Sequence, residues 1–378
     1  MGDVFKEYSE KNHTELSALT IIQGGGTVKR EDSDRNLMYD TSNLSNYKMV
    51  RKDDFIVHLR SFEGGLEKSS LDGIISPAYH TFHSDMADSR FYYPYFRSYE
   101  FIKHKLVSHV YGIRDGRSID IDGMKTIEIP YTSIEEQRKI GDYLDCLDHL
   151  ITLHQRKCEQ TKNLKKYMLQ KMFPQNGAKV PEIRFNGFTH DWEQRKFGDV
   201  VQVRRGLTYK PSDVQETGVR VLRSSNINED TFVCGNDDVF VNPKTVNIDT
   251  VKQNDILITS ANGSSRLVGK HALIKGIPDE SAVHGGFMLL GITKNYDFIN
   301  ASMNSSWYIR FINIYVTGGN GAIGNLSKSD LDEQLILVPS DLEQKKIGEY
   351  FTNLDHLITL HQRQTDFYKK PNFYFISS

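Results

Sequence analysis

Residues 147–156 read Leu-Asp-His-Leu-Ile-Thr-Leu-His-Gln-Arg, and residues 354–363 repeat this decamer 207 positions later. Extending the match back to Glu136 and Glu343 gives 16 identities in 21 positions, six before the decamer and ten within it. A period of this length indicates a duplicated unit, whose function must depend on what differs between its copies.

Each copy opens with a helix-start signal. Ser133 and Glu136 form an S-x-x-E capping box, and so do Ser340 and Glu343. Apolar residues then recur in steps of four, three and four, as in a heptad seam. Nothing from Ile134 to Phe173 breaks a helix, which predicts one about 60 Å long.

The two helices are expected to pair as an antiparallel coiled coil, with the globular domains at opposite ends, because each domain precedes its own helix. Two ordinary buried helices are the alternative. The predicted pairing residues are Leu147, Ile151, His154, Leu354, Ile358 and His361.

The segments between the helices have another character. Residues 2–130 and 181–339 hold most of the glycines and aromatics and lack sustained helical periodicity. Two short apolar runs at matching places, residues 54–58 and 255–259, are typical of buried strands. The sequence therefore predicts an α+β protein with two mixed globular domains, each followed by a shared helix.

Composition narrows the class of protein. The chain has 378 residues, 38% hydrophobic and 25% charged, with no apolar run long enough for a membrane span and no signal-peptide layout. Three cysteines without a C-x-x-C pair favour reduced thiols in the cytoplasm. A net charge of −2 argues against a uniformly basic nucleic-acid coat but leaves room for a basic groove.

Several motifs together resemble the specificity subunit of type I restriction–modification enzymes. They are the helix-start motif at 339–347 with its partner at 136–140, the repeated decamer, the segment Lys165–Phe173, and Pro181–Trp192 leading into Lys196-Phe-Gly-Asp199. The resemblance covers essentially the whole chain.

This resemblance implies a domain plan and a function. Residues 1–130 and 181–339 would be target-recognition domains, while 131–180 would be the central conserved helix and 340–378 the C-terminal one. Each domain would read one half of an asymmetric, bipartite sequence in double-stranded DNA. The helices would fix the spacing between the half-sites and dock two methyltransferase subunits, and ATP-dependent restriction subunits would complete the nuclease. The chain itself would be non-catalytic and without a cofactor.

Two departures from the family pattern concern the ends. Nothing before Gly2 matches residues 181–197, so the first recognition domain is expected to be N-terminally short. Pro371 falls where the first copy has Leu164. Because proline in a helix interior costs about 3 kcal/mol, the distal helix is expected to stop near Lys370, as in a truncated or rearranged product.

DNA contacts are expected from polar, glycine-containing loops, because phosphates need cationic or small donors and bases need Arg, Lys, Asn, Gln or Ser at groove edges. A solvated surface turn is the alternative for each loop. The second-domain candidates are Arg204, Arg205, Thr208, Tyr209, Lys210, Arg223, Ser224, Asn226, Asn262, Ser264, Arg266, Lys270, Asn320, Asn325 and Lys328. The first-domain candidates are Lys29, Arg30, Arg51, Arg60, Arg114 and Arg117.

Catalytic signatures are missing. The chain has no Asn-Pro-Pro-aromatic stretch of an amino-methyltransferase and no phosphate-binding G-x-x-x-x-G-K-[ST] loop. The nuclease-like run Asp341-Leu-Glu343-Gln-Lys345 sits at a helix start, where we expect Glu343 to cap. His154 and His361 continue the apolar seam and are expected to set the register rather than bind metal.

Two other function classes stay open. The chain could act alone as a DNA-binding remnant or regulator, or serve as a coiled-coil scaffold without restriction–modification partners. A scaffold does not account for two divergent domains on near-identical helices.

Overall fold

The computed structural model describes residues 1–33, 41–58, 60–112, 118–175, 177–316 and 324–377, with side-chain detail omitted at 41, 42 and 370–377. The chain has a mixed helix and strand content and divides into two compact units. Unit 1 contains Met1–Lys157 and His361–Ser378, and unit 2 contains Cys158–Leu360. Each unit therefore holds one globular region and a part of both long helices.

The globular region of unit 1 is built on a four-stranded antiparallel sheet in the order β1-β8-β5-β6. The predicted buried strand at 54–58 is confirmed as β5, whose three residues are all buried. Aromatic rings fill the core beneath it, where Phe5, Phe55 and Phe96 meet edge to face. The strands of unit 1 are β1 (Lys6–Tyr8), β2 (Leu19–Ile22), β3 (Gly26–Lys29), β4 (Lys48–Val50), β5 (Phe55–Val57), β6 (Glu67–Lys68), β7 (Gly73–Ile75), β8 (His80–His83), β9 (Val110–Tyr111) and β10 (Ser118–Ile119).

Short helices connect these strands. They are the α-helices α1 (Ser61–Gly64), α2 (Ser89–Phe96) and α3 (Ile121–Lys125), the π-helix η3 (Glu100–Leu106), and the 3-10 turns η1 (Arg30–Asp32), η2 (Thr41–Asn46) and η4 (Val107–His109).

The globular region of unit 2 contains two four-stranded sheets, β12-β22-β18-β20 and β13-β17-β14-β21. The predicted strand at 255–259 is confirmed as β18. All neighbours in these sheets are antiparallel except β14 and β21, which run parallel. The strands of unit 2 are β11 (Glu193–Lys196), β12 (Gln202–Arg205), β13 (Val214–Gln215), β14 (Val219–Leu222), β15 (Ile227–Asn228), β16 (Thr231–Phe232), β17 (Val239–Val241), β18 (Ile256–Thr259), β19 (Ala261–Asn262), β20 (His271–Leu273), β21 (Ala282–His284), β22 (Met288–Ile292), β23 (Gly324–Asn325) and β24 (Leu335–Val338).

Short helices connect the strands of unit 2. They are α5 (Phe197–Val200), α6 (Tyr296–Met303), α7 (Ser306–Tyr315) and α8 (Lys328–Glu333), with the 3-10 turns η6 (Pro211–Asp213), η7 (Ser224–Asn226), η8 (Pro243–Thr245) and η9 (Ser265–Leu267).

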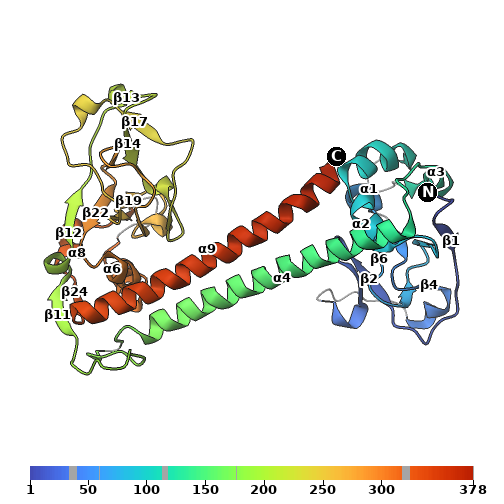
Figure 1. Cartoon of the computed structure of the whole chain (residues 1–378), viewed down its shortest axis with the longest axis horizontal. Helices are drawn as coiled ribbons and strands as arrows, with labels where there is room; N and C mark the ends of the chain where they lie inside the picture. Colours follow the sequence, from blue (N-terminus) through green and yellow to red (C-terminus); the bar gives the residue numbers. More distant parts are fainter. Residues whose placement is uncertain (34–40, 59, 113–117, 176, 317–323, 378) are drawn as a thin grey trace. The chain divides into compact units, whose positions relative to one another are not determined.

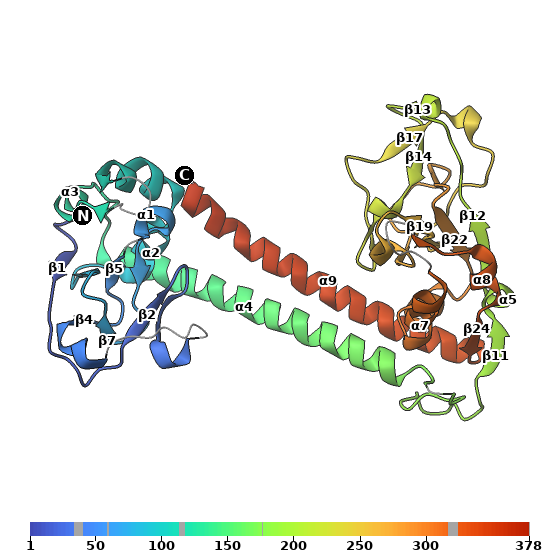
Figure 2. The same ribbon diagram turned by 180° about the vertical axis from the view of Figure 1, so that it is seen from behind.

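The two predicted long helices are α4 (Ile134–Lys171) and α9 (Asp341–Ser377). Within unit 2 the end of α4 lies beside the start of α9, as both views show (Figures 1 and 2). The ammonium of Lys165 lies 2.7 Å from the carboxylate of Asp355, and the ring of Phe173, just beyond α4, lies 5.9 Å from that of Phe351. Residue numbers rise along one helix as they fall along the other, so the two segments of unit 2 run antiparallel.

Two local expectations about these helices are wrong. Helix α9 continues through Pro371 to Ser377 instead of stopping near Lys370. A proline removes only one amide donor, so the residues beyond it can still form their own helical bonds. Glu343 does not close a capping box either, because the guanidinium of Arg184 binds its buried carboxylate through two hydrogen bonds of 2.7 and 2.8 Å.

The repeated glutamine of the helix-start motif docks each globular region onto its own helix. In unit 1, the Gln137 amide donates to the Thr132 carbonyl (2.8 Å) and accepts from the Asp88 backbone N–H (3.0 Å). In unit 2, the Gln344 amide donates to the Pro339 carbonyl (2.8 Å) and accepts from the side chain of Asn295 (2.7 Å).

Asp88 and Asn295 are the N-cap residues of α2 and α6. They are 207 residues apart, as are Gln137 and Gln344. The duplication therefore includes a docking contact to a short helix of each domain.

A glycine in each copy allows the same short helices to approach closely. A Cβ on Gly141 would lie 3.0 Å from the Cβ of Arg90 in α2, and one on Gly348 would lie 2.8 Å from the Cβ of Asp297 in α6. The contact at Gly348 would force a shift and the one at Gly141 would be tight, so both positions favour glycine for want of space.

Candidate nucleic-acid interface

Unit 2 contains a cavity of about 820 Å³ at the place where several predicted DNA-binding segments meet. Three of those segments contribute to its walls, together with residues 285–288, which carry no DNA-binding motif. The lining residues are Leu207, Thr208, Tyr209, Pro211, Val214, Arg223, Ser224, Ser225, Asp237, Ala261, Asn262, Gly263, Gly285, Gly286, Phe287 and Met288.

The sheet topology brings these segments together. Because β14 and β21 are parallel and Leu222 pairs with His284, the chain leaves both strands at the same edge, at Arg223 and Gly285. Leu207 forms a parallel bridge with Gly285, which places 207–209 beside them. The amides of Ser260 and Ala261 both donate to the Phe287 carbonyl, which adds the wall at 261–263.

Polar side chains of the lining form hydrogen bonds and ion pairs within the wall itself. The Asn262 amide donates to the Ser224 hydroxyl (2.9 Å) and accepts from the Ser264 N–H (2.9 Å). Arg223 is the one cation of the described lining, and its guanidinium donates to the Asp237 carbonyl (2.5 Å) and lies 3.6 Å from that residue's carboxylate. The wall thus offers hydroxyl, amide and aromatic groups, which suit base edges better than phosphate neutralisation.

A buried histidine under this edge adds no charge. Burial lowers the pKa of His284 to about 4, so its ring is neutral at pH 7. No sequence motif marks this residue.

The two arginines expected on a loop around Gly206 lie elsewhere. Arg204 and Arg205 belong to β12, which ends at Arg205, and neither lines the cavity. Adjacent strand residues point to opposite faces, so the two guanidiniums cannot act as one cluster. Arg204 forms an ion pair of 2.5 Å with Asp249, whereas Arg205 is exposed.

Asn226 is 1% exposed and has a structural role. Its amide accepts from the Arg223 N–H (2.8 Å) and donates to the Val233 carbonyl (3.0 Å) and the Asp238 carboxylate (2.7 Å). These bonds leave it unable to reach a base, which corrects its assignment as a reader.

The remaining second-domain candidates lie outside the lining. Lys210, Ser264, Arg266 and Asn325 are exposed, Lys270 is half-buried, and Lys328 forms an ion pair with Asp332. Asn320 falls outside the described residues.

In unit 1, the glycine loop before Lys29 already holds an anion of the protein. The amides of Gly24 and Gly26 donate to the two oxygens of the Glu67 carboxylate at 2.7 and 3.3 Å. Glu67 is fully buried and also accepts from the Tyr93 hydroxyl (2.8 Å) and from Arg97. These amides are therefore not available to a phosphate.

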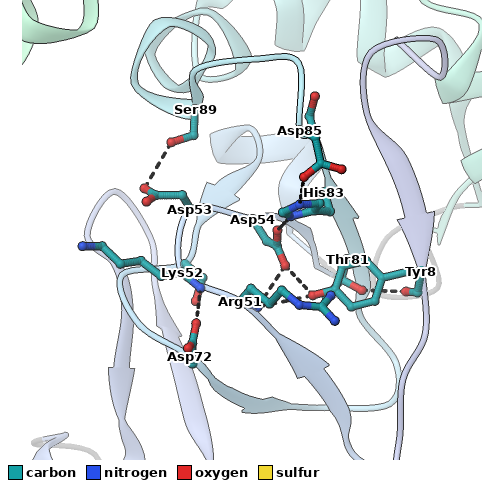
Figure 3. A network of polar contacts seen from close by, with 12 residues as sticks. Tyr8, Arg51, Lys52, Asp53, Asp54, Asp72, Thr81, His83, Asp85 and Ser89 are labelled. Carbon is teal, nitrogen blue, oxygen red and sulfur yellow. Dashed lines mark hydrogen bonds and ion pairs between the residues drawn. The ribbon is translucent and has the colours of Figure 1, made fainter. Parts of the chain in front are cut away.

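Arg51 belongs to a network around the buried carboxylate of Asp54 (Figure 3). Its backbone N–H and the Tyr8 hydroxyl donate to one oxygen of Asp54, and His83 lies 2.5 Å from the other. The Arg51 guanidinium binds both oxygens of Glu10 at 2.8 and 2.9 Å. Arg51 thus already has an internal carboxylate partner.

His83 is more easily protonated in this network than a free histidine. Burial opposes protonation of its ring, but hydrogen bonds to Asp54 and Asp85 outweigh burial and raise the pKa of His83.

The other first-domain candidates vary in their surroundings. Arg30 donates to the Leu19 carbonyl (3.3 Å), and Lys29 lies 3.8 Å from Glu31, while Arg60 is exposed. Arg114 and Arg117 fall outside the described residues.

The predicted seam positions of both long helices are all at least partly protected from solvent. Leu147, His154 and Leu354 are buried, and Ile151, Ile358 and His361 are half-buried. Within unit 1, Nδ1 of His154 lies 3.1 Å from Nδ1 of His361, so one ring donates and the other accepts. Burial first, and then the neighbouring His361, lower the pKa of His154.

The part of the chain that the structure describes has no cluster of three metal-ligating side chains. Its helices also include none that is long and apolar enough to cross a membrane.

Comparison with known proteins relates part of the chain to a known family. Residues 189–366 match the type I restriction modification DNA specificity domain. The chain is 31% identical over 114 residues to the type I restriction enzyme MjaVIII specificity subunit of Methanocaldococcus jannaschii, a match that spans 29% of this chain and 26% of that protein.

Two solved structures share the fold. The type I restriction–modification S subunit from M. genitalium has a TM-score of 0.59 at 16% identity, covering 99% of this chain and 93% of that one. A chain from a structure on the assembly and conformational transition of the type I R-M system has a TM-score of 0.50 at 16% identity, covering 99% and 95%. Residues 189–366 of this chain therefore match a type I restriction modification DNA specificity domain.

Proposed function

We propose that this chain is the sequence-reading subunit of a type I restriction–modification complex and is itself non-catalytic. The observation that carries the proposal is the unit 2 cavity, where Thr208, Ser224 and Asn262 come together from three separate segments. Hydroxyl and amide groups converging beside aromatic rings are the chemistry that distinguishes base edges in a groove.

The duplication supports a bipartite target. Each globular region is docked onto its own helix by an equivalent glutamine, yet the two regions differ in sequence. We therefore propose two target-recognition domains, each reading one half-site of an asymmetric target in double-stranded DNA. Helices α4 and α9 would pair as an antiparallel coiled coil and set the spacer.

Partners are part of the proposal. A net charge of −2 leaves too few surplus cations to neutralise many phosphates. Two methyltransferase subunits would clamp the duplex and supply catalysis, and ATP-dependent restriction subunits would add cleavage. Such a complex would work in the cytoplasm.

The test is co-expression with the methyltransferase subunits of a type I system, followed by sequencing of methylated bases in the host genome. The expected result is one asymmetric motif in two parts separated by a fixed gap. Single alanine substitution of Ser224, in the cavity, should relax one half-site only, because readers on a rigid spacer share no base pairs. A contiguous motif, or no methylation by a correctly assembled complex, would contradict the proposal.

A stand-alone DNA-binding role makes a different prediction. Affinity for the target duplex and its salt dependence, measured by fluorescence anisotropy, would then be equal with and without the methyltransferase subunits. The proposed role predicts weak binding by the chain alone.

A further inference from the structure

Phe287 is the most exposed large side chain of the cavity lining, with 70% of its surface open to solvent. The next residue, Met288, begins β22 and is 1% exposed in the core. Successive strand residues alternate between faces, so burying Met288 keeps Phe287 outside.

The backbone beneath Phe287 is firmly held. Its carbonyl accepts two amides, from Ser260 (2.9 Å) and Ala261 (3.1 Å), and the Met288 N–H donates to the Gly285 carbonyl (2.8 Å). A Cβ on Gly286 would lie 3.2 Å from the Thr208 hydroxyl oxygen, so the turn packs tightly against the opposite wall. The Phe287 ring is therefore exposed to solvent on a backbone that is fixed by hydrogen bonds.

The surroundings of this ring indicate what it meets. The cavity lining around this ring mixes hydroxyls, the Asn262 amide and the ring of Tyr209 with apolar side chains such as Leu207 and Val214. The single guanidinium of the described lining, that of Arg223, is held by Asp237. An apolar side chain beside polar readers is the arrangement with which groove-binding proteins unstack a base step. A protein partner would instead call for a continuous apolar patch.

We propose that Phe287 inserts against a base step of the half-site read by unit 2 and unstacks it. This inference rests on the proposed function, because it names how the same cavity engages the duplex. The ring would supply apolar contact, while the polar groups around it select the neighbouring bases.

The experiment uses the chain assembled with its methyltransferase subunits and a duplex carrying the motif found by methylome sequencing. 2-Aminopurine is placed in turn at each position of the two half-sites. The variants are Phe287→Ala, Phe287→Leu and, as a matched control, Ile314→Ala. Ile314 is 71% exposed on α7 of the same unit and does not line this cavity.

The wild-type complex should raise 2-aminopurine fluorescence at one step of one half-site. Phe287→Ala should abolish that rise and weaken binding about 10-fold or more, the size expected for losing one aromatic–base contact. Phe287→Leu should retain much of the rise, because leucine also serves as a wedge. The Ile314→Ala complex should match wild type.

Unchanged fluorescence and affinity in Phe287→Ala would overturn the inference, while wild-type specificity would leave the proposed function standing. Loss of methyltransferase subunits from the purified Phe287→Ala complex would instead assign the ring to a protein interface and also overturn it. A wild-type complex without sequence preference would refute the proposed function itself.

Discussion

Gln344 makes a quantitative prediction about how a globular region is held on its helix. Its side-chain amide joins the Pro339 carbonyl to Asn295, the N-cap of α6, and it is buried. Gln344→Ala removes these two hydrogen bonds and leaves their partners unpaired, at a cost of about 1–2 kcal/mol each. Local stability should therefore fall by about 2–4 kcal/mol.

Gln137 should behave alike in the other unit. It bonds the Thr132 carbonyl and the Asp88 N–H at similar distances, so Gln137→Ala removes the same number of bonds. Because each glutamine contacts only its own unit, the two effects should appear in different places. Gln137→Ala should loosen α2, and Gln344→Ala should loosen α6.

Native-state hydrogen exchange measures both effects, since it reports opening free energies segment by segment. Amides of α2 and α6 should exchange about 30- to 1000-fold faster in the respective variants, the factor equivalent to 2–4 kcal/mol. Lys139→Ala and Lys345→Ala, exposed neighbours on the same helices, are matched controls that should change neither. Equal loosening of α2 and α6 by either glutamine variant would refute the docking argument.

The remaining predictions concern the seam and the cavity. Replacing both Leu147 and Leu354 by aspartate should place charge at buried positions and destabilise by several kcal/mol; an unchanged Tm would rule out the seam. The lowered pKa of His154 means that the unfolded state binds its proton more tightly, so stability should be full above pH 6.5 and fall as pH drops through the folded-state pKa. His154→Gln should flatten that part of a Tm-versus-pH profile, and an unchanged profile would exclude the contact with His361. Asn226→Ala should lower the free energy of unfolding, measured in urea, by about 2–4 kcal/mol because it breaks three buried hydrogen bonds. A change of base preference without loss of stability would restore Asn226 as a base-reading residue.

Helices were the predictable part of this fold because their signals are local. The seam spacing and the helix-start motif predicted α4 and α9 with bounds within a few residues at all ends except beyond Pro371. Long-range competition caused the other error. Glu343 has the sequence of a capping residue, but Arg184, 159 positions earlier, takes its carboxylate.

The sequence predicted most of the segments that form the candidate site but not which of their residues face the cavity. Polar composition pointed to three of the four cavity walls, yet no local rule separates Asn226, which is locked in the structure, from Asn262, which lines the cavity. Phe287 gave no signal, because a phenylalanine after two glycines fits a buried strand as well as an exposed tip. Which face it takes depends on Met288 and on pairing with β18, and both are tertiary facts.

The two docking sites share a frame but differ at one pair of positions. In unit 1, Arg90 of α2 reaches Asp145 of α4 (3.1 Å), and in unit 2, Asp297 of α6 accepts from the Thr352 hydroxyl of α9 (2.9 Å). Arg90 and Asp297 are 207 residues apart, and so are Asp145 and Thr352. The chain therefore keeps a polar contact at this place in both copies while changing its chemistry. Exchanging the two globular regions would set Asp297 against Asp145, two like charges. The shared glutamine and glycine thus hold any domain with this docking helix, whereas the paired polar residues match each domain to its own copy of the helix.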